Sequence, residues 1–228
     1  MAKRNVEVIY FGDPGDEPEE ASMEFRLTYA GELKSTANDS TTARKAEHKH
    51  ALRMAFHPQL KRLWEITPFL KTGERSGPDV LLLSGDMQKA PPPDYSVDTL
   101  SKRHSLYGWN FVPLVTKDLD LWCGMDILFL RPGKPGHAVN QGDVDGRLKT
   151  LLDALAIPDA NQGYSDRDVI RGPLFTLLED DRLISKVSVE TDEMLELEAG
   201  KINENFVRLV ITVSIRPYEM HLGNMQFG

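Results

Sequence analysis

The chain has 228 residues, 40% of them hydrophobic and 27% charged, with a formal net charge of −8 at pH 7. This length and composition suit one globular domain, residues 1–228, with a sizeable core. No apolar run is long enough to span a bilayer, and the first residues lack the apolar core of a signal peptide. Cys123 is the only cysteine, so no disulfide forms within the chain, and its apolar neighbours predict a buried, inert thiol. We therefore expect a cytoplasmic protein without a membrane partner.

The charges are unevenly distributed along the chain. The negative total disfavours a nucleic-acid-binding surface, yet the segment from Arg44 to Arg75 carries eight positive and three negative side chains. A basic helix here could contact DNA phosphates or could simply present a solvated charged face. His48 and His50 do not share a helical face and no cysteine is near, so a surface role is favoured over zinc binding.

Sequence patterns in the first hundred residues predict two strands and one main helix. Val6–Tyr10 has the composition of a short strand, and the alternation of Phe25, Leu27 and Tyr29 with polar residues is typical of a half-buried one. An apolar stripe from residue 43 to about 65 predicts a helix. Pro58 is expected to break this helix in two. Segments rich in Gly, Pro, Ser or acidic residues are expected to form loops, at 11–22, 35–42 and 72–105.

The second half predicts a sheet with a helix packed on it. Leu148, Leu151, Leu152 and Leu155 follow the spacing of one helical face. Strands are expected at 111–116, 119–130, 184–189 and 206–215, and the second of these becomes continuously apolar, as a central strand does. Five or six strands with two main helices in mixed order indicate an α+β fold built on a mixed sheet. Trp64, Trp109 and Trp122 are expected in the core or at a dimer interface rather than as base-stacking platforms.

Carboxylates gather at the start of the predicted helix. Asp143 and Asp145 lie at its first turn, Lys149 lies one turn further, and Asp180-Asp181 precede the next strand. Carboxylates brought together repel one another, so a fold that gathers them usually offsets the repulsion with a cation such as Mg²⁺. Alternatively, the two first acids serve as helix cap and dipole partners, and Lys149 pairs with Asp145 and Asp153 along the helix.

The ordered set resembles the RusA-type Holliday junction resolvases. In that family Asp-x-Asp-Asn-x-x-Lys precedes Leu-[Asp/Asn]-[Ala/Gly]-Leu, then Asp-Asp and a strand with basic residues. The chain has Asp143-Val144-Asp145-Gly146-Arg147-Leu148-Lys149, then Leu152-Asp153-Ala154-Leu155 and Asp180-Asp181. The resemblance covers roughly residues 110–215. Gly146 replaces the family's Asn, and the segment between Leu155 and Asp180 is longer than expected.

The resemblance implies a RusA-like mixed α/β core at residues 106–217, with residues 1–105 as an elaboration. It implies a homodimer that cleaves branched DNA with Mg²⁺, or Mn²⁺ as a substitute. Asp143, Asp145 and Asp181 would be catalytic acids that bind the metal, with Asp180 as a further ligand. Lys149 would be an essential base or phosphate contact. Dimerisation suits the task, because two symmetric cuts in a four-way junction need two symmetric sites.

Two other functions stay open. The first is a related dimeric module that binds DNA or protein with weak or absent catalysis, which Gly146, the long segment and the negative charge favour. The second is a metal-dependent phosphohydrolase acting on nucleotides, which activity on free nucleotides but not on junctions would favour.

Overall fold

The computed structural model describes residues 6–10, 23–35, 41–72, 95–106, 108–132, 143–159, 172–195, 205–219 and 223–227. The predicted loop at 11–22 and most of the predicted excursion at 72–105 lie outside these residues. The predicted α+β class is confirmed, with strands and helices mixed along the chain. Its strands are β1 (Val6–Tyr10), β2 (Met23–Glu32), β3 (Ser105–Leu106), β4 (Trp109–Val115), β5 (Leu121–Arg131), β6 (Leu174–Leu178), β7 (Ile184–Glu193) and β8 (Phe206–Pro217). Its helices are α1 (Thr42–Ile66), α2 (Pro68–Thr72), α3 (Val97–Arg103) and α4 (Asp143–Leu155), with short 3-10 turns η2 (Lys117–Leu119), η4 (Asp181–Leu183) and η5 (Met225–Phe227).

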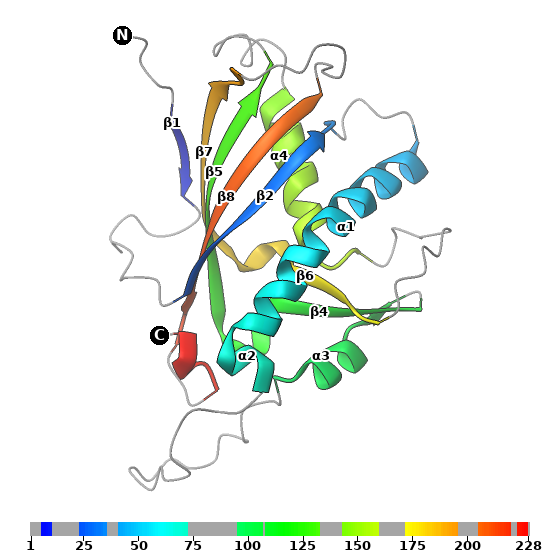
Figure 1. Cartoon of the computed structure of the whole chain (residues 1–228), viewed down its shortest axis with the longest axis vertical. Helices are drawn as coiled ribbons and strands as arrows, with labels where there is room; N and C mark the ends of the chain where they lie inside the picture. The colour runs from blue at the N-terminus through cyan, green and yellow to red at the C-terminus, as the bar shows by residue number, and fades with distance from the viewer. Residues whose placement is uncertain are drawn as a thin grey trace, which may run out of the picture.

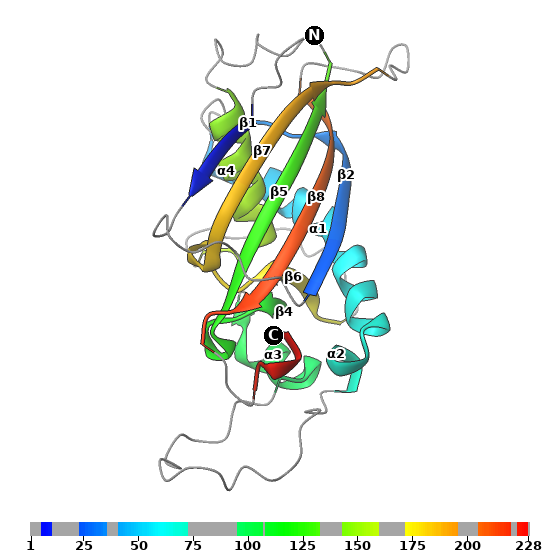
Figure 2. The same cartoon turned by 90° about the vertical axis from the view of Figure 1, so that its left-hand side faces the viewer.

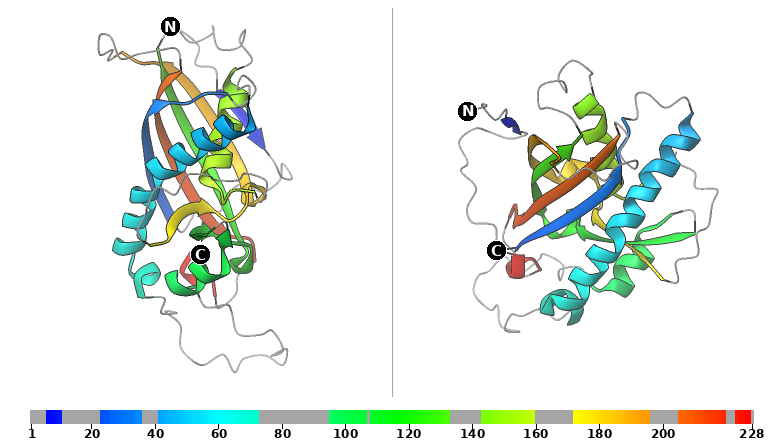
Figure 3. Two further views of the ribbon diagram at one scale, coloured as in Figure 1. Left: turned by 90° about the vertical axis from the view of Figure 1, so that its right-hand side faces the viewer. Right: turned by 45° about the horizontal axis from the view of Figure 1, so that its top comes forward.

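The larger sheet has the strand order β1-β7-β5-β8-β2, so the continuously apolar β5 is central as predicted. β5 runs parallel to β7 and antiparallel to β8. α1 and α4 lie over one face of this sheet (Figures 1 and 3), while Figure 2 looks onto the opposite face, which no described helix crosses. The covered face supplies much of the core: in β8 the alternate residues are at most 1% exposed, namely Val207, Leu209, Ile211, Val213 and Ile215.

A second sheet, ordered β3-β4-β6, corrects the expected single sheet of five or six strands. β4 and β6 pair in parallel below α1 (Figure 1), and the contacts of β6 with α1 join this sheet to the core. All five residues of β6 are buried, so the strand has no polar face and shows no alternation in the sequence. That is why the pattern at Leu174–Leu178 gave no prediction.

α1 is a single helix of 25 residues that continues through Pro58, so the predicted break there is wrong. Pro58 is exposed, and the buried stripe on both sides of it stays in phase along Leu52, Phe56, Leu60 and Trp64. Burial of this stripe outweighs the one backbone hydrogen bond that Pro58 cannot donate. The helix ends instead at Ile66, because Thr67 is extended before Pro68, where α2 begins.

The residues before 106 supply two strands of the larger sheet, β1 and β2, and the helix α1 that covers it.

Among the predicted core residues, Cys123, Trp64 and Trp109 are buried, as expected. Burial raises the pKa of the Cys123 thiol to about 12, which keeps it protonated. Trp122 differs, because it is only half-buried and lies on β5. None of the described helices is long and apolar enough to cross a membrane.

Candidate functional site

The predicted site residues occupy both ends of α4. Asp143 is the first residue of the helix, and its side chain lies outside the described part of the structure. Asp145, in the same turn, and Lys149, in the next turn, are exposed, and within the described residues no ion pair joins them to each other. Asp180 and Asp181 instead lie beside the last turn of the helix, near Asp153. Because Asp145 precedes Asp153 by eight residues, the two lie about 12 Å apart along the axis.

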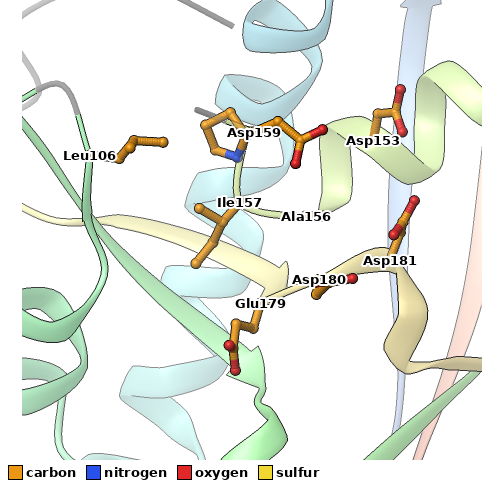
Figure 4. A pocket seen from close by; sticks show the side chains of 9 residues that line it. Leu106, Asp153, Ala156, Ile157, Asp159, Glu179, Asp180 and Asp181 are labelled. Atoms are coloured by element: carbon orange, nitrogen blue, oxygen red, sulfur yellow. The ribbon is translucent and has the colours of Figure 1, made fainter. Parts of the chain in front are cut away.

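A pocket of about 250 Å³ opens where the end of α4, the end of β6 and η4 meet. Figure 4 shows Asp181 pointing toward Asp153, with Asp159 beside them and Glu179 turned away. Apolar side chains of the segments that follow α4 and α3 form the rest of the wall. The lining residues are Leu106, Asp153, Ala156, Ile157, Pro158, Asp159, Glu179, Asp180 and Asp181.

Asp180 is strongly engaged by cations within the protein. Its carboxylate caps η4 by accepting from the backbone N–H of Arg182, and Arg182 Nη2 and Lys117 Nζ donate to it at 2.6 and 3.0 Å. The hydrogen bonds from Arg182, aided by those from Lys117, hold the pKa of Asp180 well below its usual range despite partial burial. Asp180 therefore stays ionised, with its charge already offset.

Asp181 has the opposite electrostatic character. Burial is the largest cause that raises the pKa of its carboxyl group, followed by the negative charges of Asp180, Asp153 and Asp159. No described cation forms an ion pair with Asp181. A cation placed next to Asp181 would relieve this repulsion, which is the character expected of a metal ligand.

Asp153 is fixed by α1, which the sequence reasoning missed. Lys49 Nζ lies 2.5 Å from Asp153 Oδ2, and the two side chains are 11% and 19% exposed. Arg53, 1% exposed, donates from Nε to the carbonyl of Ala156 at 3.1 Å and from Nη2 to that of Asp153 at 2.9 Å. Arg53 thus caps the C-terminus of α4. Asp153 pairs with Lys49 rather than with Lys149.

The spacing of Lys49 and Arg53 along α1 already indicated that they face the core. Lys49 and Arg53 lie at i and i+4, and Phe56 and Leu60 continue the same side of α1 at i+7 and i+11. Two of the cations assigned to a DNA-facing or solvated surface are therefore buried structural groups. The histidines of α1 are also structural: His48 Nε2 accepts the N–H of Lys34, and His57 Nδ1 accepts that of Phe175.

The packing of α4 explains Gly146. A Cβ atom at this position would lie 2.0 Å from Ser35 Oγ and 3.0 Å from Ser35 Cβ. Ser35 is itself 5% exposed, in the segment after β2. The close approach of that segment to α4 leaves no room for an Asn side chain. Gly146 is therefore required by the packing of residues before 106, which the family motif does not include.

Within the described residues, no group of three His, Cys, Asp or Glu side chains lies close enough to hold a metal ion. Asp181 has the electrostatics of a ligand, Asp145 is exposed, and the Asp143 side chain lies outside the described set. No protein-family model matches the chain, and no curated protein or solved structure is significantly similar to it. The resemblance to the RusA-type resolvases therefore rests on the sequence motif alone.

Proposed function

We propose that this chain is a Mg²⁺-dependent, structure-selective endonuclease of the RusA type that cleaves branched DNA as a homodimer. The observation that carries the proposal is Asp181, a carboxylate crowded by Asp153 and Asp180 and without a described cation partner. Asp181 lies beside the helix that carries Asp143, Asp145 and Lys149. Along the chain these residues follow one another in the order of the resolvase motif. Crowded carboxylates with raised pKa values are frequent at functional sites.

The donor chemistry of Asp181, Asp145 and Asp143 fits hard divalent cations, because Mg²⁺ prefers oxygen ligands and retains several waters. Asp181 lies beside the last turn of α4 and Asp145 lies about 12 Å from that turn along the helix axis, so a single ion shared by these carboxylates would require η4 and the start of α4 to move together. Asp180 fits less well as a ligand, since Arg182 and Lys117 already occupy its oxygens. When bound, the ion would lower the pKa of a coordinated water and neutralise charge at the scissile phosphate.

The remaining groups of the chain would position the DNA. The ammonium group of Lys149 is exposed and within the described residues has no carboxylate partner, so it can contact the scissile phosphate. Exposed cations of α1 would hold the backbone of a duplex arm; they are Arg44, Lys61 and Arg62. Lys49 and Arg53 are excluded from that role by their burial.

A second candidate is a DNA- or protein-binding module of the same fold without strong catalysis. It is favoured by the internal cations: Lys49 offsets Asp153, and Lys117 and Arg182 offset Asp180, so most of the acidic charge is balanced without a metal. Such a module would bind a four-way junction, or a protein partner, without cutting DNA.

Cleavage of a synthetic four-way junction with Mg²⁺ separates the two candidates. We expect paired cuts by the wild type and at least a hundredfold loss for Asp145→Asn and Asp181→Asn, since each removes a charged metal ligand. Asp126→Asn is the matched control, because Asp126 is an exposed carboxylate on β5 paired with Lys186. Equal cleavage by wild type and both site variants, or junction binding without any cleavage, would refute the endonuclease.

A further inference from the structure

Three side chains form a stack at one end of the uncovered face of the larger sheet. Trp122 of β5 lies opposite Arg216 of β8, and Tyr218 follows the end of β8. The Trp122 and Tyr218 ring centroids are 4.5 Å apart with their planes 31° from parallel, and Arg216 Cζ lies 5.4 Å from the Trp122 centroid. This end of the face, where β5 begins and β8 ends, is at the bottom of Figure 2.

The stack is accessible from solvent. Tyr218 is 64% exposed and is one of three large hydrophobic residues exposed in the described part of the chain. Within the same residues, no carboxylate forms an ion pair with the guanidinium of Arg216. The exposed face of Tyr218, backed by the Trp122 ring and flanked by the Arg216 guanidinium, is accessible to a ligand from solvent.

The stack is connected to the acidic pocket through η2. The backbone N–H of Tyr218 donates to the carbonyl of Asp120, and that of Asp120 donates to the carbonyl of Lys117 at 3.0 Å. Lys117 in turn binds Asp180 in the pocket wall at 3.0 Å. Asp120 has a left-handed backbone (φ 47°), which reverses the chain between η2 and the start of β5. The segment that carries Tyr218 is therefore linked to the wall of the acidic pocket through residues 117–120.

We infer that this stack, Trp122, Arg216 and Tyr218, binds an unpaired nucleotide of a DNA strand. The base would stack on the outer face of Tyr218, and Arg216 would contact the adjoining phosphate. Aromatic faces bind bases without regard to sequence, and a planar guanidinium suits a phosphate. The inference rests on the proposed function, because it assigns the substrate as DNA with unpaired bases at its branch.

The surroundings favour a nucleotide over an apolar protein surface. The next positions on this face are Gly124, Ser214 and Lys186, which pair with one another across β5, β8 and β7. A protein hot spot is normally ringed by residues that exclude water, whereas these positions offer a hydroxyl and a lysine that is paired with Asp126. A nucleotide needs only an aromatic ring for its base and a cation for its phosphate.

The test is the affinity for labelled oligothymidylate, measured by fluorescence anisotropy with a metal chelator so that cleavage does not contribute. We expect Tyr218→Ala to weaken binding about 5- to 100-fold, Tyr218→Phe to bind like the wild type, and Arg216→Ala to lower the salt dependence by about one phosphate contact. Leu195→Ala, at a residue 92% exposed and outside the stack, is the control and should bind normally. Binding of blunt duplex should be the same for all variants.

No measurable oligothymidylate binding by the wild type, equal affinity of wild type and Tyr218→Ala, or an equal loss for blunt duplex would each overturn the inference. Other outcomes distinguish a failure of this inference from a failure of the proposed function. If junctions are not cleaved but Tyr218 controls single-strand binding, the stack stands and the endonuclease does not. If junctions are cleaved but Tyr218→Ala binds oligothymidylate normally, the endonuclease stands and the stack does not.

Discussion

Replacing Arg53 with Met should destabilise the protein because Arg53 joins α1 to the end of α4. The guanidinium is 1% exposed and donates to the carbonyls of Ala156 and Asp153. Methionine keeps most of the apolar stem but leaves both carbonyls without this donor. Those carbonyls belong to the last turn of α4 and to the residue after it, where no further helical N–H follows.

The expected cost follows from these contacts. An unsatisfied buried carbonyl costs about 1–3 kcal/mol, and the Asp153 carbonyl is only partly buried, so the two together cost about 2–5 kcal/mol. Removing a buried guanidinium also recovers some desolvation energy, which lowers the expected loss to about 2–4 kcal/mol. With an m-value of about 3 kcal/mol/M, the urea midpoint should fall by about 1 M.

Arg62→Met is the matched control on the same helix. Arg62 is 70% exposed and lies 3.5 Å from Glu65, so its replacement should cost less than about 1 kcal/mol. Urea unfolding of wild type and both variants, followed by circular dichroism, measures the difference. Equal midpoints for Arg53→Met and Arg62→Met would show that Arg53 does not hold the end of α4.

Three further predictions concern the site and its helices. Gly146→Asn, which introduces the Asn of the RusA-type motif, should cost about 1–3 kcal/mol of stability because its Cβ meets Ser35, and Ser35→Gly should recover part of the loss in the double variant. Asp180→Asn should lower the urea midpoint at pH 7 and Asp181→Asn should raise it, because the pKa of Asp180 is lowered and that of Asp181 raised on folding. The Asp181 difference should shrink as the pH falls toward about 4, whereas the Asp180 difference should shrink only below about 4; midpoints that move in the same direction at pH 7 would contradict this. The pKa of His57 is lowered by burial and by Lys61, so the free energy of unfolding should fall as the pH drops below about 6.5. If His57→Gln keeps the same dependence of the urea midpoint on pH as the wild type, His57 is excluded as the cause.

The strands with a polar face could be predicted from the sequence, because apolar and polar residues alternate where one face of a strand is buried and the other is exposed. β2 and β8 show this alternation, and the apolar run of β5 marks a central strand. β6 could not be distinguished from an apolar loop, since both of its faces are buried. The continuity of α1 through Pro58 depends on the tertiary burial of its stripe, which outweighs the local preference to end the helix.

The candidate site was only partly predictable for a related reason. The order of Asp143, Asp145, Lys149 and the Asp180-Asp181 pair marks a functional segment, but it does not specify which residues of α1 face it. The Lys49–Asp153 contact joins positions 104 residues apart, and no local pattern encodes such a pairing. The same holds for Gly146, whose reason lies in Ser35 rather than in the motif.

Calorimetric titration with Mg²⁺ and Mn²⁺ tests most directly the claim that carboxylates of α4 and η4 hold a divalent cation. We expect a binding heat for the wild type and for Asp126→Asn, and its loss in Asp145→Asn and Asp181→Asn. Asp180→Asn should retain it, because Arg182 and Lys117 already engage that carboxylate. No heat with the wild type, or identical isotherms for wild type, Asp145→Asn and Asp181→Asn, would contradict the claim.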